Sequence, residues 1–292
     1  MQALVSINGE ILTQDKAMIS VFDRGFLFGD GVYETGKSLD RCPLFLEEHL
    51  ARLQRSASKL LIPVPWTQEV LKAYLFDLLK AFGKDNAYFR MYVTRGSIDT
   101  VGLDKFETAR PNLVLFAQNL PESMDAKRRV GLSLLTSKII RNSIKAQDPD
   151  IKTSNYLNSL LALQDVKSRG ADDGVLCDLD GNVTEGTTFS IFGITKQGTL
   201  ITPSLEVGIL NSITRKHIVQ LAKKVMQVEE GIYPLAEFQN CIEVFIASSV
   251  REIFPVREWD GVKFNPDFKM SLSLLEKFQV EIEEYVRKSD RY

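Results

Sequence analysis

The chain has 292 residues, and its 36 lysines and arginines nearly balance its 38 aspartates and glutamates, giving a formal net charge of −2. This balance offers no strongly basic surface for a phosphate backbone, so nucleic acid is not an expected partner. The three cysteines are scattered and odd in number, which argues against a disulfide framework or a cysteine metal site and fits a reducing compartment. No signal peptide and no apolar run of about 18 residues is found. We therefore expect a cytoplasmic protein that does not bind membranes, with one large or two moderate domains.

Residues 1–121 are predicted to form an N-terminal α+β domain. The dipeptide Asn8-Gly9 between two short apolar runs is a strong β-hairpin signal. Thr67 is typical of a helix N-cap and Gly83 of a helix end, so a helix is expected between them. The polar stretch after residue 120 interrupts this pattern and predicts a linker at 122–129. The predicted elements are a hairpin of 4–7 and 10–12, helices 44–59 and 67–81, and strands 87–94 and 112–117.

Residues 130–292 are predicted to form a larger C-terminal domain. The run Asp180-Gly181-Asn182 is a second hairpin signal. Leu157, Leu160, Leu161 and Val166 give the helix 155–168 an apolar side. Strands and helices do not alternate as they do in a doubly wound sheet, so the expected class is α+β. The other predicted elements are strands 130–136, 174–179, 183–185, 188–194, 200–202 and 241–248, and helices 213–226 and 267–288.

Most common catalytic arrangements are absent from the sequence. The only histidines are His49 and His217, too few for a metal site of several histidines, and neither accompanies a G-x-S-x-G nucleophile elbow. The run Gly29-Asp30-Gly31 lacks the third glycine of a dinucleotide fingerprint, so it predicts a tight turn. Lys152 remains, at the entry to a predicted helix. Burial beside cations can lower a lysine pKa from about 10.4 and expose a nucleophilic amine, although a lysine taken alone is usually a surface charge.

Six segments of the chain together resemble the class IV (fold type IV) pyridoxal-phosphate-dependent aminotransferase family. The first, FDRGFLFGDGVYE, resembles the family's N-terminal signature, and IKTSNYL around Lys152 resembles its cofactor-lysine segment. The segments occur in family order from about residue 20 to about residue 260, so the resemblance spans nearly the whole chain. They are Phe22–Glu34, Glu48–Leu53, Ile151–Leu157, Glu185–Phe192, Ile209–Arg215 and Ala247–Val256.

The resemblance implies a fold, a cofactor and an assembly. The fold is a two-domain α+β architecture similar to that of D-amino-acid aminotransferases, with a barrel-like sheet in the C-terminal, cofactor-binding domain. The cofactor is pyridoxal 5'-phosphate, which Lys152 carries as a Schiff base. Lys152 is also expected to shuttle a proton during transamination. Relatives complete the active site with a loop from the partner subunit, so a homodimer is expected.

The same resemblance assigns the contacts with the cofactor. Arg52 is expected to meet the phosphate with its planar fork of donors, and Glu185 to hold a proton on the pyridine nitrogen. Tyr156 is expected to hydrogen-bond the phenolic oxygen. Thr214 begins a predicted helix, whose N-terminal N–H groups and dipole suit a phosphate. Further contacts are expected from Ile213, Ser248 and Ser249.

Each of these residues also has an ordinary structural interpretation. An arginine on an amphipathic helix, such as Arg52, is usually a solvated charge, and Glu185 could be an exposed strand residue. Thr214 could simply lie near a helix start, and the tyrosines could be core aromatics. The family interpretation is favoured because independent segments would otherwise imitate one cofactor site by chance.

The substrate pocket is expected to contain Tyr33, Tyr88, Arg90 and Val250. Tyr88 and Arg90 lie two residues apart on a predicted strand and face the same side. This Tyr-x-Arg pattern resembles branched-chain aminotransferases, in which the arginine can meet the side-chain carboxylate of glutamate. The sequence therefore favours a transaminase that moves the amino group of a branched-chain or other apolar L-amino acid to 2-oxoglutarate.

Other functions on the same scaffold stay open. After Glu34 the branched-chain pattern Gly-Ile-Arg is replaced by Thr35-Gly36-Lys37. The loop Ser97–Asp104 carries neither the arginine nor the histidine that D-amino-acid aminotransferases usually place there, and lyase relatives typically have a lysine where Arg90 lies. The alternatives are a 4-amino-4-deoxychorismate lyase, a D-amino-acid or (R)-amine transaminase, and a cofactor-binding protein without turnover.

Overall fold

The computed structural model describes residues 3–106, 109–121 and 124–292. By its contacts the chain divides into two units. Unit 1 contains Met1–Pro121, Ile151–Asn155 and Ile282–Tyr292, and unit 2 contains Glu122–Asp150 and Tyr156–Glu281. Unit 1 thus covers the predicted N-terminal domain and adds two later segments, one of which carries Lys152. The predicted linker 122–129 opens unit 2, and its residues 122–123 lie outside the described residues.

Unit 1 is built on a sheet of six strands in the order β2-β1-β6-β5-β3-β4, and every neighbouring pair is antiparallel. The predicted hairpin is confirmed, because Ile7 pairs with Glu10 across the Asn8-Gly9 turn. The strands are β1 (Ala3–Ile7), β2 (Glu10–Thr13), β3 (Gly31–Leu39), β4 (Cys42–Pro43), β5 (Ala87–Ser97) and β6 (Arg110–Gln118). The helices are α1 (Arg24–Phe28), α2 (Leu46–Lys59) and α3 (Gln68–Phe82).

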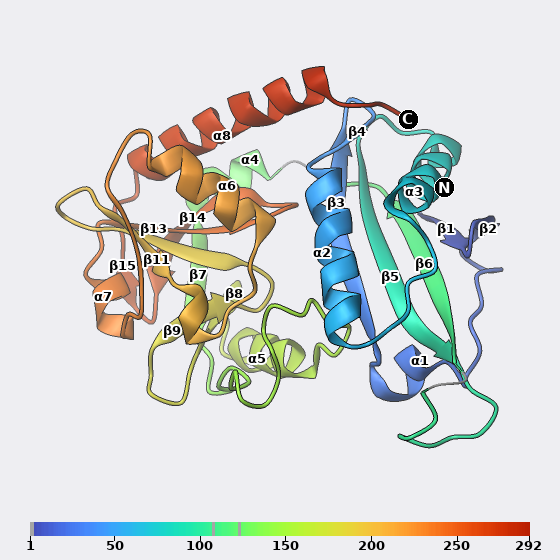
Figure 1. Ribbon diagram of the computed structural model, residues 1–292. Coiled ribbons are helices and arrows are strands. Elements are labelled where there is room, and N and C mark those ends of the chain that lie inside the picture. Colours follow the sequence, from blue (N-terminus) through green and yellow to red (C-terminus); the bar gives the residue numbers. More distant parts are fainter. Residues whose placement is uncertain (1–2, 107–108, 122–123) are drawn as a thin grey trace. The chain divides into compact units, whose positions relative to one another are not determined.

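Alternation along the central strands gives the sheet of unit 1 two different faces. On β5 the side chains of Phe89, Met91 and Val93 are fully buried, and they belong to the same apolar core as residues of α2 and α3. Tyr88 and Arg90 lie between them and point to the opposite face. Figure 1 shows α2 running beside β3 on the helix-covered face. Buried apolar side chains therefore alternate along the same strand with polar side chains that point to the other face.

Two further predictions in unit 1 can be compared with the structure. The helix predicted after Thr67 is confirmed, with Thr67 as N-cap and Gly83 as a left-handed C-cap. Strand β3 was not predicted. Its Glu34 and Lys37 are buried, and charged residues at buried positions hide the apolar alternation by which a strand is recognised.

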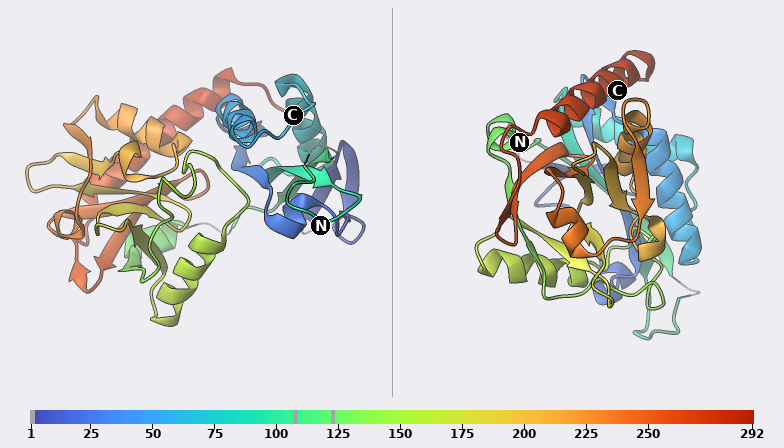
Figure 2. Two further views of the ribbon diagram at one scale, coloured as in Figure 1. Left: turned by 60° about the horizontal axis from the view of Figure 1, so that its bottom comes forward. Right: turned by 90° about the vertical axis from the view of Figure 1, so that its left-hand side faces the viewer.

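Unit 2 is built on a mixed sheet of nine strands in the order β12-β11-β10-β13-β14-β7-β8-β9, with β15 paired to β14. Its strands are β7 (Leu132–Thr136), β8 (Asp173–Cys177), β9 (Val183–Gly186), β10 (Ser190–Ile194), β11 (Leu200–Pro203), β12 (Val228–Gly231), β13 (Glu243–Ser248), β14 (Glu252–Trp259) and β15 (Val262–Lys263). Although β9 is the last strand of this order, it lies against β10 and β11. The sheet therefore curls into a half-barrel (Figure 2), and the predicted barrel-like sheet is confirmed.

Two of the helices of unit 2 pack on one face of this curved sheet, whereas Phe238 of a short helix belongs to the core on the other face. On β13, Val244 and Ile246 belong to a core on one face, whereas Phe245 and Ala247 join a second core that includes residues of α6 and α8. The helices are α4 (Asp125–Val130), α5 (Leu157–Ser168), the short 3-10 helix η1 (Leu205–Val207), α6 (Ile213–Ala222), α7 (Leu235–Gln239) and α8 (Lys269–Lys288), whose C-terminal end belongs to unit 1. No helix in the described part of the chain is long and apolar enough to cross a membrane.

The prediction for the apolar side of α5 is wrong for its leucines. Of the four predicted residues Val166 is buried, but Leu157, Leu160 and Leu161 are 61%, 58% and 43% exposed, and the smaller Ala162 lies on the buried face instead. The spacing predicted the helix correctly but not the direction of its leucines, because periodicity does not say which of two adjacent faces meets the core.

The close approach of Gly96 on β5 to the backbone of β6 gives a stability prediction. Gly96 has φ +95°, and a Cβ there would overlap the carbonyl of Arg110. Gly96→Ala is expected to destabilise the fold by on the order of 3–4 kcal/mol, since strain and a backbone clash combine. Gly83 has φ +73° with nothing within 4 Å, so Gly83→Ala is the matched control, at about 1–2 kcal/mol. Urea unfolding of both variants measures the difference, and equal losses would contradict the clash.

Candidate active site

Lys152 is held against strand β3 of unit 1. The backbone N–H of Tyr33 donates to the carbonyl of Lys152 at 2.9 Å, and the N–H of Lys152 donates to the hydroxyl of Ser56 on α2 at 3.2 Å. The Lys152 Nζ lies 3.4 Å from the Tyr33 hydroxyl and 4.5 Å from the centre of its ring. The half-buried amine is therefore fixed beside a phenol on the face of the sheet opposite the helices.

Arg52 lies on the helix-covered face of the same strand, in a buried charge cluster. Its Nε and Nη2 donate to the two carboxylate oxygens of Glu34 at 2.6 and 2.8 Å, and His49 Nδ1 lies 2.6 Å from the same carboxylate. Burial alone raises the pKa of Glu34, but Arg52 and His49 hold it well below its ordinary value. Because an ionised carboxylate only accepts, Nδ1 of His49 carries the hydrogen. Arg52 is 4% exposed, so its interpretation as a solvated charge is wrong.

Arg90 is surrounded by aromatic rings and hydroxyls. Its guanidinium lies 4.7 Å from the ring centre of Tyr33 and 5.5 Å from that of Tyr92. Nε donates to the Thr35 hydroxyl at 3.1 Å and Nη1 to the Tyr92 hydroxyl at 2.8 Å. Burial alone lowers the pKa of Arg90, and the neighbouring tyrosines raise it above its usual value. Among the described residues no carboxylate forms an ion pair with Arg90, so this half-buried cation is available to a ligand carboxylate.

Glu185 is one of the buried acids of unit 2, near the end of β9. One of its oxygens accepts from Arg141 Nη2 at 2.6 Å, and the other accepts from the backbone N–H of Leu210 at 3.3 Å. A carboxylate at this position can accept a hydrogen bond from a protonated ring nitrogen. Glu185 is 9% exposed, so it is not the exposed strand residue of the ordinary interpretation.

The first turn of α6 and the β13–β14 turn together bring hydroxyls and N–H groups into one place. Ser212 is the N-cap of the helix and accepts from the N–H of Arg215. The hydroxyls of Thr214 and Ser249 lie 3.4 Å apart. The unpaired N–H groups of a helix start, its dipole and two hydroxyls are suited to a phosphate.

The remaining predicted residues lie close to these groups in the sequence. Tyr156 immediately precedes α5 in unit 2, and Val250 lies in the same turn as Ser248 and Ser249. Ile213 begins α6 beside Thr214 and is 6% exposed. Tyr88 pairs in register with Lys37, two positions along the strands from the Arg90–Thr35 pair.

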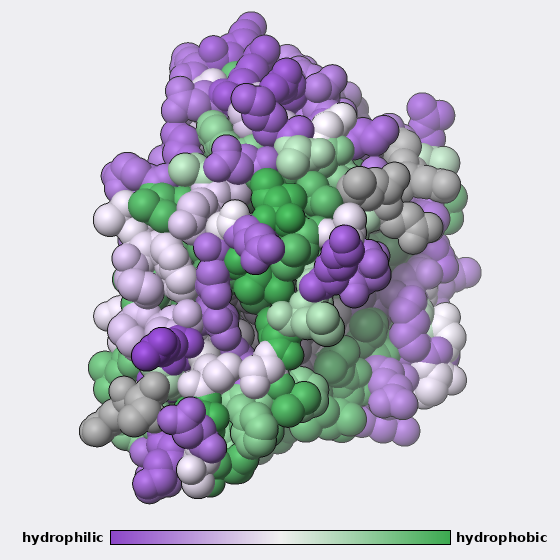
Figure 3. All heavy atoms as spheres, turned by 90° about the vertical axis from the view of Figure 1, so that its right-hand side faces the viewer, coloured by the Kyte–Doolittle hydropathy of each residue, from purple (hydrophilic) through white to green (hydrophobic). Residues whose placement is uncertain are grey.

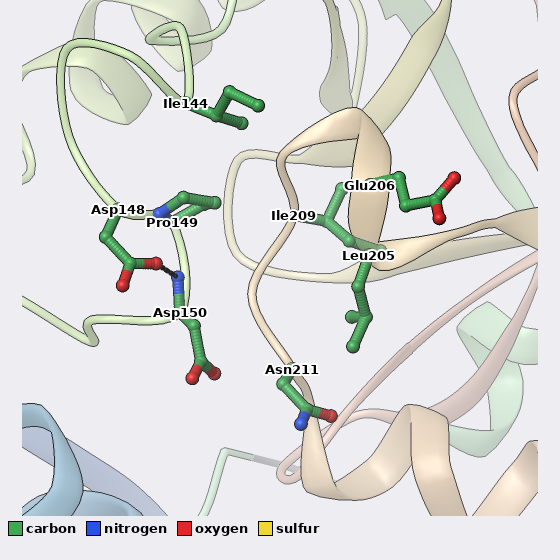
Figure 4. Close-up of a pocket in the computed structure, with 8 residues that line it drawn as sticks. All are labelled: Ile144, Asp148, Pro149, Asp150, Leu205, Glu206, Ile209 and Asn211. Carbon is green, nitrogen blue, oxygen red and sulfur yellow. Dashed lines mark hydrogen bonds between the residues drawn. The ribbon is translucent and has the colours of Figure 1, made fainter.

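A cavity of about 250 Å³ lies in unit 2 between the loop before Lys152 and η1 (Figure 4). None of the predicted site residues lines it. Three of its lining residues, Asp148, Asp150 and Glu206, are acidic, and the carboxylate of Glu206 points away from the loop that carries the two aspartates (Figure 4). Its lining residues are Ile144, Asp148, Pro149, Asp150, Leu205, Glu206, Ile209 and Asn211.

The geometry can be compared with known families. Residues 31–259 match the model of the family described as amino-transferase class IV. The chain belongs to the class IV aminotransferases. These enzymes use pyridoxal 5'-phosphate. Each unit has groups whose chemistry suits a part of this cofactor: a half-buried amine and a buried guanidinium in unit 1, and a buried carboxylate and a helix N-terminus with two hydroxyls in unit 2.

Class IV relatives carry out more than one reaction. The chain is 35% identical over 262 residues to the "Putative branched-chain-amino-acid aminotransferase" of Methanocaldococcus jannaschii, covering 89% of each. It is 29% identical over 281 residues to the aminodeoxychorismate lyase of Bacillus subtilis, covering 94% of this chain and 92% of that one. Among solved structures, the branched-chain aminotransferase of Thermoproteus uzoniensis with norvaline superposes with a TM-score of 0.90 at 24% identity, covering 98% of both chains. The last comparison confirms the predicted fold.

The sequence analysis did not predict the charged partners that hold Arg52 and Glu185 in place. Glu34 ends the first motif and His49 lies three residues before Arg52, so a pairing across the strand and helix could have been suspected. Arg141 lies in an irregular stretch with no motif around it. Only the fold brings it to Glu185.

The Glu34 cluster predicts a pH-dependent stability difference. Glu34→Gln leaves Arg52 buried without its counter-charge, which is expected to cost about 3–5 kcal/mol near neutral pH. The folded-state pKa of Glu34 lies below its ordinary value of 4.5, so its contribution is complete above about pH 4.5 and is lost as the pH falls further. The stability gap between wild type and Glu34→Gln should therefore narrow in acid. Denaturant unfolding at pH 7 and pH 3 tests this, and a constant gap would speak against an ionised Glu34.

Proposed function

We propose that this class IV aminotransferase moves the amino group of a branched-chain or other apolar L-amino acid to 2-oxoglutarate, with pyridoxal 5'-phosphate attached through Lys152. The observation that carries the proposal is the placement of Lys152 and Arg90 around one side chain. The Lys152 amine and the Arg90 guanidinium lie 4.5 and 4.7 Å from the ring centre of Tyr33. The amine of Lys152 thus lies on the same face of the sheet as a cation that has no carboxylate partner among the described residues.

When bound, the cofactor accepts the amino group and withdraws electrons from the substrate Cα. The residues of unit 1 serve this step in different ways. Lys152 attaches the cofactor, and its released amine then moves a proton between the substrate Cα and the cofactor C4′. The Tyr33 hydroxyl, 3.4 Å from Nζ, orients that amine. Glu34 keeps the guanidinium of Arg52 in one orientation for the phosphate.

Further cofactor contacts are proposed for residues of unit 2. Glu185, paired with Arg141, would accept a hydrogen bond from the protonated ring nitrogen, which would keep the ring electron-poor. Thr214 and Ser249 bind the phosphate with their hydroxyls and the N–H groups around them. Tyr156 donates to the phenolic oxygen. Ile213 and Ser248 complete the phosphate contacts.

Substrate choice is proposed to depend on the face around Arg90. Glutamate and an aliphatic amino acid must use one pocket in turn, so a cation is needed for the carboxylate and an apolar wall for the aliphatic chain. Tyr33, Tyr88 and Val250 provide the wall, and Arg90 the cation. Lys37 is buried on the same face of β3 and can assist with the carboxylate.

A substrate panel tests this function against its alternatives. The protein is expected to be yellow and to form glutamate from L-leucine and 2-oxoglutarate. Lys152→Ala should abolish turnover and leave only loosely bound cofactor, because both attachment and proton transfer need the amine. Release of pyruvate from aminodeoxychorismate would instead identify a lyase, and consumption of D-leucine or an (R)-amine would overturn the L assignment. A spectral change without product would leave only cofactor binding.

Arg90→Met gives a second functional prediction. The KM for glutamate or 2-oxoglutarate should rise far more than that for L-leucine, with a loss of about 2–5 kcal/mol, roughly thirty-fold or more in kcat/KM. Arg287→Met, on the exposed end of α8, is the control. Equal losses for both substrates would mean that Arg90 only stabilises the sheet.

We also propose a homodimer, which exposed apolar side chains in both units support. In unit 1, Met18, Val21 and Phe26 are 79%, 64% and 67% exposed. Apolar side chains also gather across the face of this unit on which β1 and β2 lie (Figure 3). In unit 2, Leu157 and Leu160 protrude from α5 at 61% and 58% exposure. Clustered exposed apolar groups of this kind mark association surfaces.

Leu160→Glu is expected to disrupt this dimer without unfolding the chain, since an exposed position tolerates a charge. An obligate interface of about 2,000 Å² or more should otherwise keep the wild type dimeric at micromolar concentration. Sedimentation velocity measures the change, and Leu179→Glu, at an exposed turn position (73%), is the control. A monomeric and fully active wild type would refute the dimer.

A further inference from the structure

A buried carboxylate of unit 2, which the proposed chemistry does not use, bonds to two of the segments assigned to the cofactor. Asp173 lies on β8 and is 3% exposed. Its Oδ1 accepts from the Thr187 hydroxyl at 2.6 Å, and its Oδ2 accepts from Arg251 Nη1 at 2.8 Å. Thr187 lies two residues after Glu185, and Arg251 lies two residues after Ser249. A single side chain therefore joins the two segments, with a different oxygen for each.

Arg251 links this carboxylate to the β13–β14 turn (residues 248–251). The N–H of Arg251 donates to the Ser248 hydroxyl at 3.3 Å. The same residue thus contacts the turn with its backbone and Asp173 with its side chain. Its guanidinium also lies 5.8 Å from the centre of the ring of Phe189, which is 4% exposed. The position of the turn therefore depends on contacts that Arg251 makes with residues far away in the sequence.

The backbone directly after Arg251 is strained, so its surroundings have to hold the turn. Glu252 has φ +56°, in the left-handed region that a non-glycine residue rarely adopts, and it is 6% exposed. Such a conformation costs about 1–2 kcal/mol, and it persists only where neighbouring groups fix it. Arg128 fixes the backbone, because its Nη2 donates to the Arg251 carbonyl at 2.8 Å. Asp173 fixes the side chain of Arg251, and without it the turn is free to relax.

We propose that Asp173 is a positioning residue of the cofactor site, which anchors Arg251 and so holds turn 248–251 in the shape that binds the phosphate. The inference rests on the proposed assignment of Ser248 and Ser249 to the phosphate. Asp173 acts through Arg251 and does not itself touch the cofactor. Its contact with Thr187 keeps the anchoring carboxylate in place.

The first experiment measures how tightly the protein retains pyridoxal 5'-phosphate and pyridoxal, which lacks the phosphate. In Asp173→Asn the amide oxygen can keep the bonds from the Thr187 hydroxyl and from the N–H of Gly174, but the amide nitrogen cannot accept from Arg251. The dissociation constant for pyridoxal 5'-phosphate should rise about tenfold or more, because a hydrogen bond to a charged group is lost. That for pyridoxal should change less than about twofold, since no phosphate meets the turn. Visible absorbance in equilibrium dialysis measures both constants.

Further variants separate positioning from a general loss of stability. Arg251→Met removes the same contact from a side chain that is 30% exposed. It should give the same phosphate-specific loss, and adding Asp173→Asn to it should change little. Arg251→Lys keeps a cation for the one oxygen and should bind within about threefold of the wild type. The matched control is Asp172→Asn, because this aspartate pairs with Arg257 on β14 at 3.3 Å and its side chain is 44% exposed.

Equal losses for the two ligands, or a folded Asp173→Asn protein that retains pyridoxal 5'-phosphate as the wild type does, would overturn the inference. If Asp173→Asn does not fold, Arg251→Met decides, since wild-type affinity in that variant contradicts an anchoring role. Neither measurement needs turnover. A protein that binds the cofactor but transfers no amino group would therefore refute the proposed function, and the ratio of the two dissociation constants would still decide the role of Asp173.

Discussion

Strand β3 is the constraint on which the arrangement of unit 1 depends. Because successive side chains point to opposite faces, Tyr33 meets the Lys152 amine on one face and Glu34 meets Arg52 on the other, only one residue away. The backbone of Tyr33 also binds the backbone of Lys152 directly. Moving β3 by one residue would exchange these faces and separate the amine from its phenol and the arginine from its counter-charge.

The same arrangement, a carboxylate that holds an arginine, recurs in both units. Glu34 holds Arg52, Glu185 holds Arg141, and Asp173 holds Arg251, each through bonds of 2.6 to 2.8 Å. Such partly or fully buried pairs add little net stability, because desolvation offsets attraction, but breaking one is costly. Their value is geometric, since each fixes the direction of a guanidinium or carboxylate.

The comparisons place the chain in a family whose members catalyse different reactions. A named aminotransferase and a named lyase resemble the chain at 35% and 29% identity, so the shared scaffold does not choose between them. We propose that the side chains around Tyr33 and Arg90 make this choice. There the structure has a cation bound by hydroxyls and aromatic rings.

The sequence alone determined features that depend on neighbouring residues: the Asn8-Gly9 hairpin, the helix that begins at Thr67, and the order of motifs that identified the family and its lysine. These signals are local, because turns, caps and motif spacings involve only a few consecutive residues. The tertiary structure alone decided what depends on distant residues. It paired Arg141 with Glu185, 44 positions apart (185 − 141), left the α5 leucines exposed, and made a strand of 31–39. Burial and long-range pairing are set by which surfaces meet in the fold, and local periodicity carries no record of the partner.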